Sequence, residues 1–254
     1  MQKEFTDQVA VITGAGQGIG FGIAKELCRQ GAKVLLNDEN KKLASKAANE
    51  IRENGGICEP CSGDVADAGF VKQLVDEATG RFGKLNIAVA NAGITIFGDF
   101  FTYTPGELQR VMNVNVSGTF FLAQHAARQM KLQEEKGTLL FMSSVTGHQA
   151  HKNLAAYSMT KAAIEMLAKN LVTELSQHGI TVNAIAPGAT LTERTLHDME
   201  YKKTWAAITP MGRAAEIEDI VHAAMFLISP ASRHITGQSL IIDGGWTSVS
   251  PPPF

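Results

Sequence analysis

The stretch Thr13-Gly-Ala-Gly-Gln-Gly-Ile-Gly20 stands between an aliphatic run at residues 9–13 and a segment of helical periodicity at residues 19–30. A glycine-rich turn in this context lets the backbone approach a pyrophosphate, whose charge is met by the N-terminus of the helix. The spacing is Gly-x-x-x-Gly-x-Gly at Gly14, Gly18 and Gly20, because Ile19 occupies the third glycine place of the generic pattern. Taken alone, the stretch predicts a phosphate-binding turn, with a purely structural turn as the alternative.

The second predicted strand, residues 33–37, leads into Asp38, at roughly the 20-residue spacing of dinucleotide-binding folds. A carboxylate at this place can accept hydrogen bonds from the adenosine ribose and would repel the 2′-phosphate of NADP. No arginine stands beside Asp38 to offset that repulsion. The sequence therefore favours NAD, and NADP use depends on whether Lys41 or Lys42 faces the site rather than solvent.

Short aliphatic runs alternate with helical segments along almost the whole chain, which is the pattern of βαβ units. We expect one α/β domain over residues 1–254, a doubly wound, Rossmann-like parallel sheet of seven strands in the order 3-2-1-4-5-6-7 with helices on both faces. The predicted strands are residues 9–13, 33–37, 57–61, 86–90, 138–142, 181–185 and 239–242, and the predicted helices are residues 19–30, 41–54, 68–82, 105–132, 153–178 and 217–228.

The composition gives no reason to expect a nucleic acid or membrane partner, since the formal net charge is -2. No apolar run approaches the roughly 18 to 20 residues of a membrane span, and the first residues lack the apolar core of a signal peptide. We expect a soluble, cytoplasmic protein.

Three cysteines are present, and Cys58 and Cys61 form a Cys-x-x-Cys motif. A structural zinc site needs four ligands, and no second cysteine pair or nearby histidine supplies the others. A redox pair would normally open a helix, whereas this motif leads into an extended segment. We therefore expect reduced, structural thiols and no metal.

Tyr157 and Lys161 stand four residues apart, so both project from one face of a helix. A free phenol titrates near pH ~10 and acts as a base at neutral pH only where a cation favours the phenolate. A unit charge at roughly 4 Å contributes on the order of 4 kcal/mol at an effective dielectric of about 20. The pair is a candidate proton-transfer centre, although an isolated Tyr-x-x-x-Lys is usually an ordinary helix pair.

Further motifs accompany the predicted elements: Asp64-Val65, Asn91-Ala-Gly93, Asn115, Ser143-Ser144, Pro187-Gly188 and Asp243-Gly-Gly245. Together with the glycine turn and the Tyr/Lys pair, they make the chain resemble the short-chain dehydrogenase/reductase family over essentially its whole length. One departure is Ala90 before Asn91, where relatives often have a second asparagine.

The resemblance implies a catalytic set of Asn115, Ser144, Tyr157 and Lys161. Tyr157 would exchange a proton with the substrate oxygen, Ser144 would polarise that oxygen, and Lys161 would favour the phenolate and hold the nicotinamide ribose. Asn115 would anchor a water that joins Lys161 to solvent, or else would satisfy only backbone groups. Ser143 is expected to be structural. The reaction would be hydride transfer between a carbinol carbon and nicotinamide.

The same resemblance places the cofactor along the carboxyl edge of the sheet. Asp64 and Val65 would flank the adenine, and Thr192 would bond the nicotinamide carboxamide. The full expected set is Gly14, Gln17, Gly18, Ile19, Gly20, Asp38, Asp64, Val65, Asn91, Ala92, Gly93, Tyr157, Lys161, Pro187, Gly188, Thr190 and Thr192.

Residues 188–212 form an unusually long connection and are predicted to be a substrate lid. Polar groups before the catalytic helix suit a sugar, polyol or keto-sugar acid, although an ordinary solvated loop would look the same. The candidate substrate residues are Ser144, His148, His151, Asn153 and Trp205.

The main alternative is a 3-oxoacyl-thioester reductase of fatty-acid synthesis. Such enzymes usually prefer NADPH and often carry an arginine before the glutamate late in the catalytic helix, where this chain has Thr173 before Glu174. A nucleotide-binding regulator without turnover is a second alternative, disfavoured by the complete catalytic set. The resemblance also implies a homotetramer or dimer built on residues 105–132 and 153–178, with residues 245–254 near a neighbouring subunit.

Overall fold

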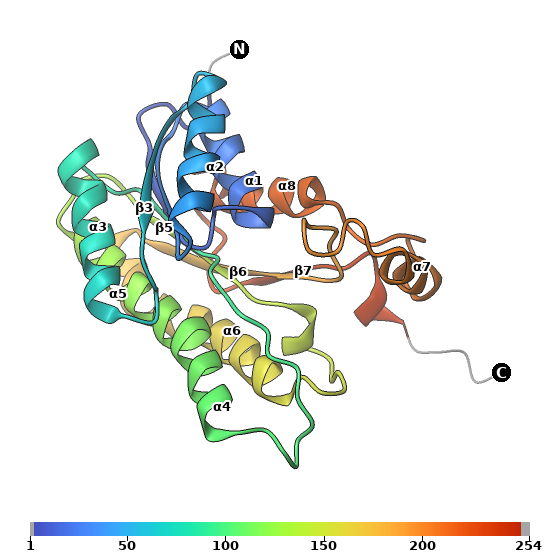
Figure 1. Cartoon of the computed structure of the whole chain (residues 1–254). Helices are drawn as coiled ribbons and strands as arrows, with labels where there is room; N and C mark the ends of the chain where they lie inside the picture. The colour runs from blue at the N-terminus through green and yellow to red at the C-terminus, as the bar shows by residue number, and fades with distance from the viewer. Residues whose placement is uncertain (1–2, 250–254) are drawn as a thin grey trace.

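The computed structural model of the chain describes residues 3–249. Seven strands within this range form one parallel sheet in the order β3-β2-β1-β4-β5-β6-β7 (Figure 1), which confirms the predicted fold class and strand order. Residues 250–254, part of the tail predicted to approach a neighbouring subunit, lie outside the described residues. The strands are β1 (Val9–Ile12), β2 (Lys33–Asp38), β3 (Ile57–Ser62), β4 (Ile87–Ala90), β5 (Thr138–Met142), β6 (Thr181–Pro187) and β7 (Ser239–Ile242).

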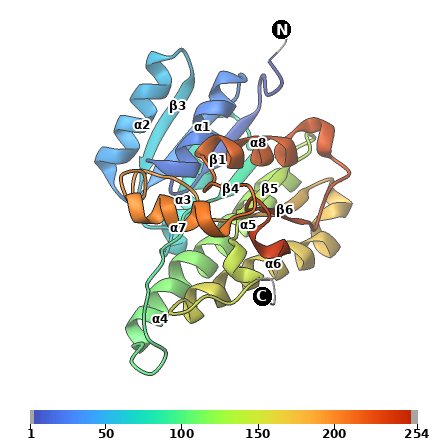
Figure 2. The same cartoon turned by 90° about the vertical axis from the view of Figure 1, so that its right-hand side faces the viewer.

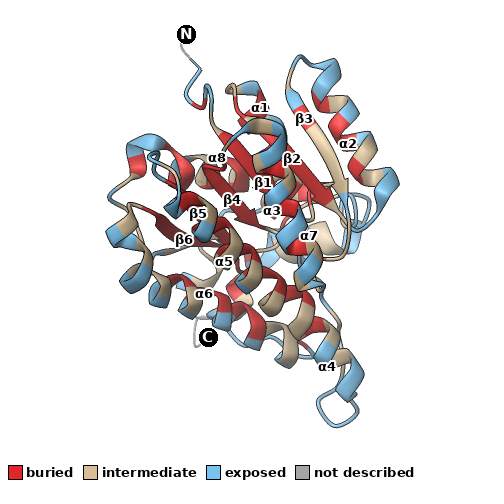
Figure 3. Cartoon of the chain, turned by 90° about the vertical axis from the view of Figure 1, so that its left-hand side faces the viewer, coloured by how far each residue is buried: buried red, intermediate tan, exposed pale blue. Residues whose placement is uncertain are grey.

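The larger helices cover both faces of the sheet, because successive side chains of each strand point to opposite sides. They are α1 (Gly18–Arg29), α2 (Lys41–Glu53), α3 (Ala68–Phe82), α5 (Gly118–Lys131), α6 (Ala155–Leu175) and α8 (Ile217–Ile228). In β1, Ala10 and Ile12 pack with α1, α2 and α8, whereas Val9 and Val11 pack with α3, α5 and α6. Figure 3 shows the resulting buried layer along the central strands.

The segment 105–132 is not the continuous α-helix that we expected. Helix α4 (Pro105–Met112) ends in a π-helical turn at Asn113–Ser117 before α5 begins. A π-helical turn inserts one extra residue into the helical repeat and often marks a functional site. Here it carries Asn115, which is fully buried.

The connection between β6 and α8 contains a short helix, α7 (Met199–Ile208). In Figures 1 and 2, α7 lies beyond one end of the strands, close to the C-terminal turn. The Trp205 ring packs edge-on against Trp246, with 5.3 Å between ring centroids, and its centroid lies 6.1 Å from that of Tyr201. These aromatic contacts join α7 to the turn that follows β7.

Cys58 and Cys61 do not face one another. Cys58 belongs to the core on the α1 and α2 side of the sheet, whereas Cys61 packs on the other side and donates a hydrogen bond to Glu77. Burial is the main reason that the pKa of the Cys61 thiol is raised to about 12, and contact with Cys28 together with burial raises that of Cys58. Both groups are therefore held as thiols.

None of the helices within residues 3–249 combines the length and the apolar character that crossing a membrane requires.

Gly22 lets α1 and α8 pack closely, because a Cβ at this position would stand 2.6 Å from Cγ2 of Ile217 and 2.9 Å from Cγ2 of Val221. Gly22→Ala should therefore lower the free energy of unfolding by about 1 to 3 kcal/mol, as overpacked cores do. Urea unfolding followed by circular dichroism measures the change.

Gly80→Ala is the matched control, since Gly80 lies in α3 and a Cβ there would meet nothing within 4 Å. This variant should gain about 0.5 to 1 kcal/mol, the usual benefit of alanine inside a helix. Equal stabilisation by both substitutions would contradict the close packing of α1 on α8.

Candidate active site

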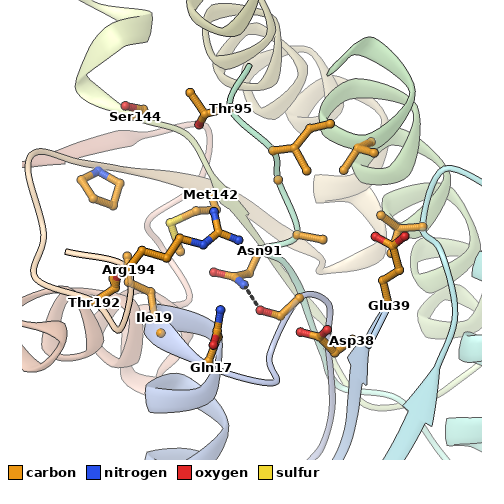
Figure 4. Close-up of a pocket in the computed structure, with 18 of the residues that line it drawn as sticks. Gln17, Ile19, Asp38, Glu39, Asn91, Thr95, Met142, Ser144, Thr192 and Arg194 are labelled. Atoms are coloured by element: carbon orange, nitrogen blue, oxygen red, sulfur yellow. Dashed lines mark hydrogen bonds between the residues drawn. The ribbon is translucent and has the colours of Figure 1, made fainter. Parts of the chain in front are cut away.

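A cavity of about 860 Å³ opens at the carboxyl ends of the strands. Its size is within the range of small-molecule and cofactor sites. Figure 4 shows Asp38 and Glu39 at one end, Ser144 and Thr95 at the other, and Asn91 between them. The predicted residues that line it are Gly14, Gln17, Gly18, Ile19, Asp38, Asp64, Val65, Asn91, Ala92, Gly93, Ser144, Tyr157, Lys161, Pro187, Gly188, Thr190 and Thr192.

The glycine turn is tied to the end of β4. Gly14 has a φ of 59°, a conformation that favours glycine, and a Cβ there would stand 2.7 Å from Cα of Ala92. The Asn91 amide donates hydrogen bonds to the carbonyl oxygens of Thr13 and Gly14, at 2.9 and 2.8 Å. Asn91 therefore holds the turn against the switch point between β1 and β4.

Asp38 lines the end of the cavity that lies away from Ser144. Its Oδ2 accepts a hydrogen bond from the Gly16 N–H at 3.0 Å, and its Oδ1 accepts one from the Asn40 N–H at 2.9 Å. The carboxylate is thereby fixed beside the glycine turn. Lys41 and Lys42 are exposed on α2 and do not line this cavity.

Asp64 is held by Arg110, which projects from α4 with 2.8 Å between Nη1 and Oδ2. Burial on its own would raise the pKa of Asp64, but hydrogen bonds from the Ala66 N–H and Arg110 outweigh it and hold the pKa below its usual range. Arg110 also lies 3.5 Å from Glu39. Arg110, outside the cavity, therefore pairs with two carboxylates that line it near Asp38.

Tyr157 and Lys161 lie on one face of α6, as their spacing predicts, and both line the cavity. Lys161 is only 3% exposed, and its Nζ donates a hydrogen bond of 2.7 Å to the carbonyl oxygen of Met142 at the end of β5. The Nζ stands 5.3 Å from the centroid of the Tyr157 ring. A buried ammonium needs such partners, because burial without them is costly. Lys161 thus places a desolvated positive charge beside the phenol.

Ser144 follows β5 and begins a short turn at Val145–Gly147. Its Oγ lines the cavity and accepts a hydrogen bond from the Thr146 N–H at 3.3 Å. Ser143 also borders the cavity, but it is buried, and its hydroxyl lies 2.6 Å from Oε1 of Glu165. The two neighbouring serines are therefore in different environments, and Ser144 is the more accessible of the two.

The Asn115 side chain is occupied by protein groups. Its Oδ1 accepts a hydrogen bond from the Ile94 N–H at 2.8 Å, and its Nδ2 donates to the Ile94 carbonyl and to Thr160. These contacts match the alternative in which Asn115 satisfies backbone groups, here those of the loop after β4. The water-anchoring role stays a prediction.

Four candidate substrate residues do not line the cavity: His148, His151, Asn153 and Trp205. His148 contacts Glu165, and His151 is exposed next to the Lys152 carbonyl. Asn153 has a φ of 63°, and its carbonyl oxygen accepts a hydrogen bond from the Gly98 N–H. Trp205 contacts Trp246 as described above.

Sequence reasoning missed three charged residues of the cavity: Glu39, which follows Asp38, and the neighbours Glu193 and Arg194. Oε1 of Glu193 accepts a hydrogen bond of 3.3 Å from the Gly18 N–H at the start of α1. Figure 4 shows Arg194 extending from the segment after β6 into the cavity. Glu193 and Arg194 directly follow Thr192, a predicted cofactor residue. This neighbourhood is the one sequence feature that could have placed them in the cavity.

The chain matches known proteins over nearly its full length. A family model described as "Enoyl-(Acyl carrier protein) reductase" matches residues 14–247. An L-rhamnose-1-dehydrogenase of Scheffersomyces stipitis is 36% identical over 250 residues, which cover 94% of this chain and 95% of that protein.

Solved structures agree with this likeness. A short-chain type dehydrogenase/reductase from Mycobacterium marinum has a TM-score of 0.92 at 34% identity, with 98% of each chain covered. A gluconate 5-dehydrogenase from Burkholderia cenocepacia, in complex with NADP and tartrate, has a TM-score of 0.91 at 33% identity, again with 98% of each chain covered. By its family-model match, its relatives and its fold, the chain belongs to the short-chain dehydrogenase/reductase family.

Proposed function

We propose that the chain is an NAD-dependent oxidoreductase that interconverts a secondary alcohol and a ketone. The observation that carries this proposal is the single cavity lined by the glycine turn, Asp38, Ser144, Tyr157 and Lys161. A dinucleotide site and a proton-transfer group must share a cavity if a hydride and a proton are to be exchanged with one substrate.

The cavity suits a nicotinamide dinucleotide. The Gly18 N–H at the start of α1 and the dipole of this helix favour a pyrophosphate, and Asp38 can accept hydrogen bonds from an adenosine ribose. Asn91, Gly93 and Thr192 line the path from there to Tyr157. When bound, the cofactor supplies the acceptor or donor of a hydride.

The side chains around Ser144 supply the proton chemistry. In alcohol oxidation, the Tyr157 oxygen takes the hydroxyl proton, and in ketone reduction it returns the proton to the carbonyl oxygen. The Lys161 ammonium, 5.3 Å from the centre of the Tyr157 ring, supplies a positive charge beside this group. The Ser144 hydroxyl donates a hydrogen bond to the reacting oxygen and orients it.

We propose NAD rather than NADP because the Asp38 carboxylate stands where a 2′-phosphate would approach the ribose. Lys41 and Lys42 lie outside the cavity and offer no counter-charge within it. The gluconate dehydrogenase relative is in complex with NADP, so the preference of this chain for NAD over NADP is tested directly below.

For the substrate we propose a sugar, a polyol or a keto-sugar acid. Relatives named for rhamnose and gluconate support this class. Arg194 in the cavity adds a cation that can meet a carboxylate. The alternative is a 3-oxoacyl-thioester reductase, which shares with the description of the matching family model only the acyl-carrier-protein class of substrate.

A steady-state screen separates these alternatives. Sugars, polyols, sugar acids and 3-oxoacyl thioesters are each assayed with NAD(H) and NADP(H) at the absorbance of the reduced cofactor. Turnover of a sugar-type substrate with NAD is expected. Turnover of thioesters alone would support the alternative, and tight cofactor binding without any turnover would support a regulator.

We also propose a single domain with residues 188–212 as a lid, and a cytoplasmic homotetramer. Exposed apolar side chains on α5 and α6, among them Phe120, Met159 and Met166, support an interface on these helices.

Tyr157→Phe should lower kcat by roughly 100- to 10,000-fold, the usual contribution of a positioned acid or base, because only the phenolic oxygen is removed. Cofactor affinity, measured by calorimetry, should change little. Tyr103→Phe is the matched control, since Tyr103 lies outside the cavity. Comparable kcat values for the two variants would refute the role of Tyr157.

Asp38→Ala should reduce the ratio of kcat/KM for NAD to that for NADP. Removing a charge that acts on a phosphate a few ångströms away changes the interaction by about 1 to 4 kcal/mol, so the ratio should fall roughly fivefold or more. Asp38→Asn keeps the shape of the side chain but not the charge and should act in the same direction.

The double variant Lys41→Ala, Lys42→Ala is the control for this ratio. Both lysines lie on the outer surface of α2, so the variant should leave the ratio unchanged. A larger shift in this variant than in Asp38→Ala would assign cofactor choice to the lysines.

A further inference from the structure

Glu165 is a buried carboxylate that the proposed chemistry does not use. It lies on α6 four residues after Lys161 and eight after Tyr157, so all three project from the same side of the helix. The residue is 8% exposed and does not line the cavity. A carboxylate is rarely buried without partners.

The partners of Glu165 stand on both sides of Ser144 in the sequence. The Ser143 hydroxyl lies 2.6 Å from Oε1 of Glu165, and Nε2 of His148 lies 2.8 Å from the same oxygen. Ser143 directly follows β5, and His148 directly follows the short turn that Ser144 precedes. One carboxylate oxygen therefore joins the two ends of the segment that carries Ser144.

Besides Glu165, regular structure contacts this segment at α6 and at β6, where the Ser143 N–H donates a hydrogen bond of 2.7 Å to the Ile185 carbonyl. Its turn at Val145–Gly147 is a single 3₁₀ turn, closed by the Gly147 N–H on the Ser144 carbonyl and the His148 N–H on the Val145 carbonyl. At Gly147 the turn packs directly on α6, because a Cβ there would stand 3.1 Å from both Oε1 of Glu165 and N of Ala162.

We propose that Glu165, with Ser143 and His148, is a positioning residue that fixes the hydroxyl of Ser144 relative to Tyr157. Both ends of the Ser144 segment are held by the helix that also carries Tyr157 and Lys161. The separation of the two reacting side chains is thereby set by one rigid element. The inference rests on the proposed function, since it concerns the oxygen that Ser144 orients. It also assigns His148 to this support instead of to the substrate.

Three variants of Glu165 and Glu174 test the proposal in the full-length protein. Glu165→Ala removes the shared acceptor, Glu165→Gln keeps an oxygen that both partners can reach, and Glu174→Ala removes an exposed carboxylate from the same helix. A misplacement of about 1 Å can cost roughly 100-fold in rate, so Glu165→Ala should lower kcat by about 10- to 100-fold.

The pattern of effects separates positioning from binding. In Glu165→Ala, cofactor affinity and KM should change by less than about threefold, while Glu165→Gln should recover most of kcat and Glu174→Ala should match wild type. His148→Ala should lower kcat in the same way, and the double variant Glu165→Ala, His148→Ala should be no worse than Glu165→Ala alone. A rise in KM at unchanged kcat in His148→Ala would overturn the proposal and make His148 a substrate ligand.

Amide hydrogen exchange gives a readout that does not need turnover. The N–H groups of Gly147, His148 and Gln149 close the turn, and they should exchange faster in Glu165→Ala but not in Glu165→Gln or Glu174→Ala. Unchanged exchange and unchanged kcat in Glu165→Ala would refute the proposal.

Failure of the proposed function and failure of Glu165→Ala to fold can each be told apart from failure of the positioning role. If wild type turns over no substrate while exchange changes as expected, the proposed function fails but the support of the turn stands. If Glu165→Ala does not fold, Ser143→Ala and His148→Ala each remove one partner, and unchanged exchange in both would refute the proposal.

Discussion

Parallel pairing is the constraint on which this structure depends. Because every strand runs the same way and both faces of the sheet are covered, all seven carboxyl ends meet at one edge, with the N-termini of following helices beside them. The order reverses at β1, which pairs with β2 on one side and β4 on the other. The loops after β1 and β4 meet at this switch point, where Asn91 joins them, and the cavity opens beside them.

Within that edge, α6 organises the reacting groups. Lys161 donates a hydrogen bond to the carbonyl of Met142, the last residue of β5. Glu165 accepts one from the hydroxyl of Ser143, the residue that follows. Two buried charged side chains one turn apart thus join a helix to a strand end by hydrogen bonds whose loss would leave a charge unpaired. Such contacts are directional, whereas the apolar packing below them is not, so they define where Tyr157 and Ser144 stand.

The sequence predicted the fold well because alternating periodicity and the glycine turn are local signals. Local signals also singled out Asp38 and the Tyr157 and Lys161 pair, which line one cavity; their roles stay predictions. The π-helical turn at Asn115 was missed, since residues 105–132 have continuous helical character and the interruption depends on tertiary contacts. His148 was assigned to the substrate because its loop is rich in polar residues. Its partner, Glu165, is 17 positions away on a different element, and no local pattern reveals that contact.

Glu193 gives the glycine turn an internal anion. Its carboxylate already accepts a hydrogen bond from the Gly18 N–H, so under the proposed function a pyrophosphate bound at this N–H would displace a group of the same chain. Because the Glu193 carboxylate is part of the chain, its local concentration at this N–H is set by the length of the connecting segment and not by the protein concentration. Cofactor binding would then remove the hydrogen bond that joins the segment after β6 to α1, so filling the nucleotide end of the cavity would change the contacts of a segment that lines it.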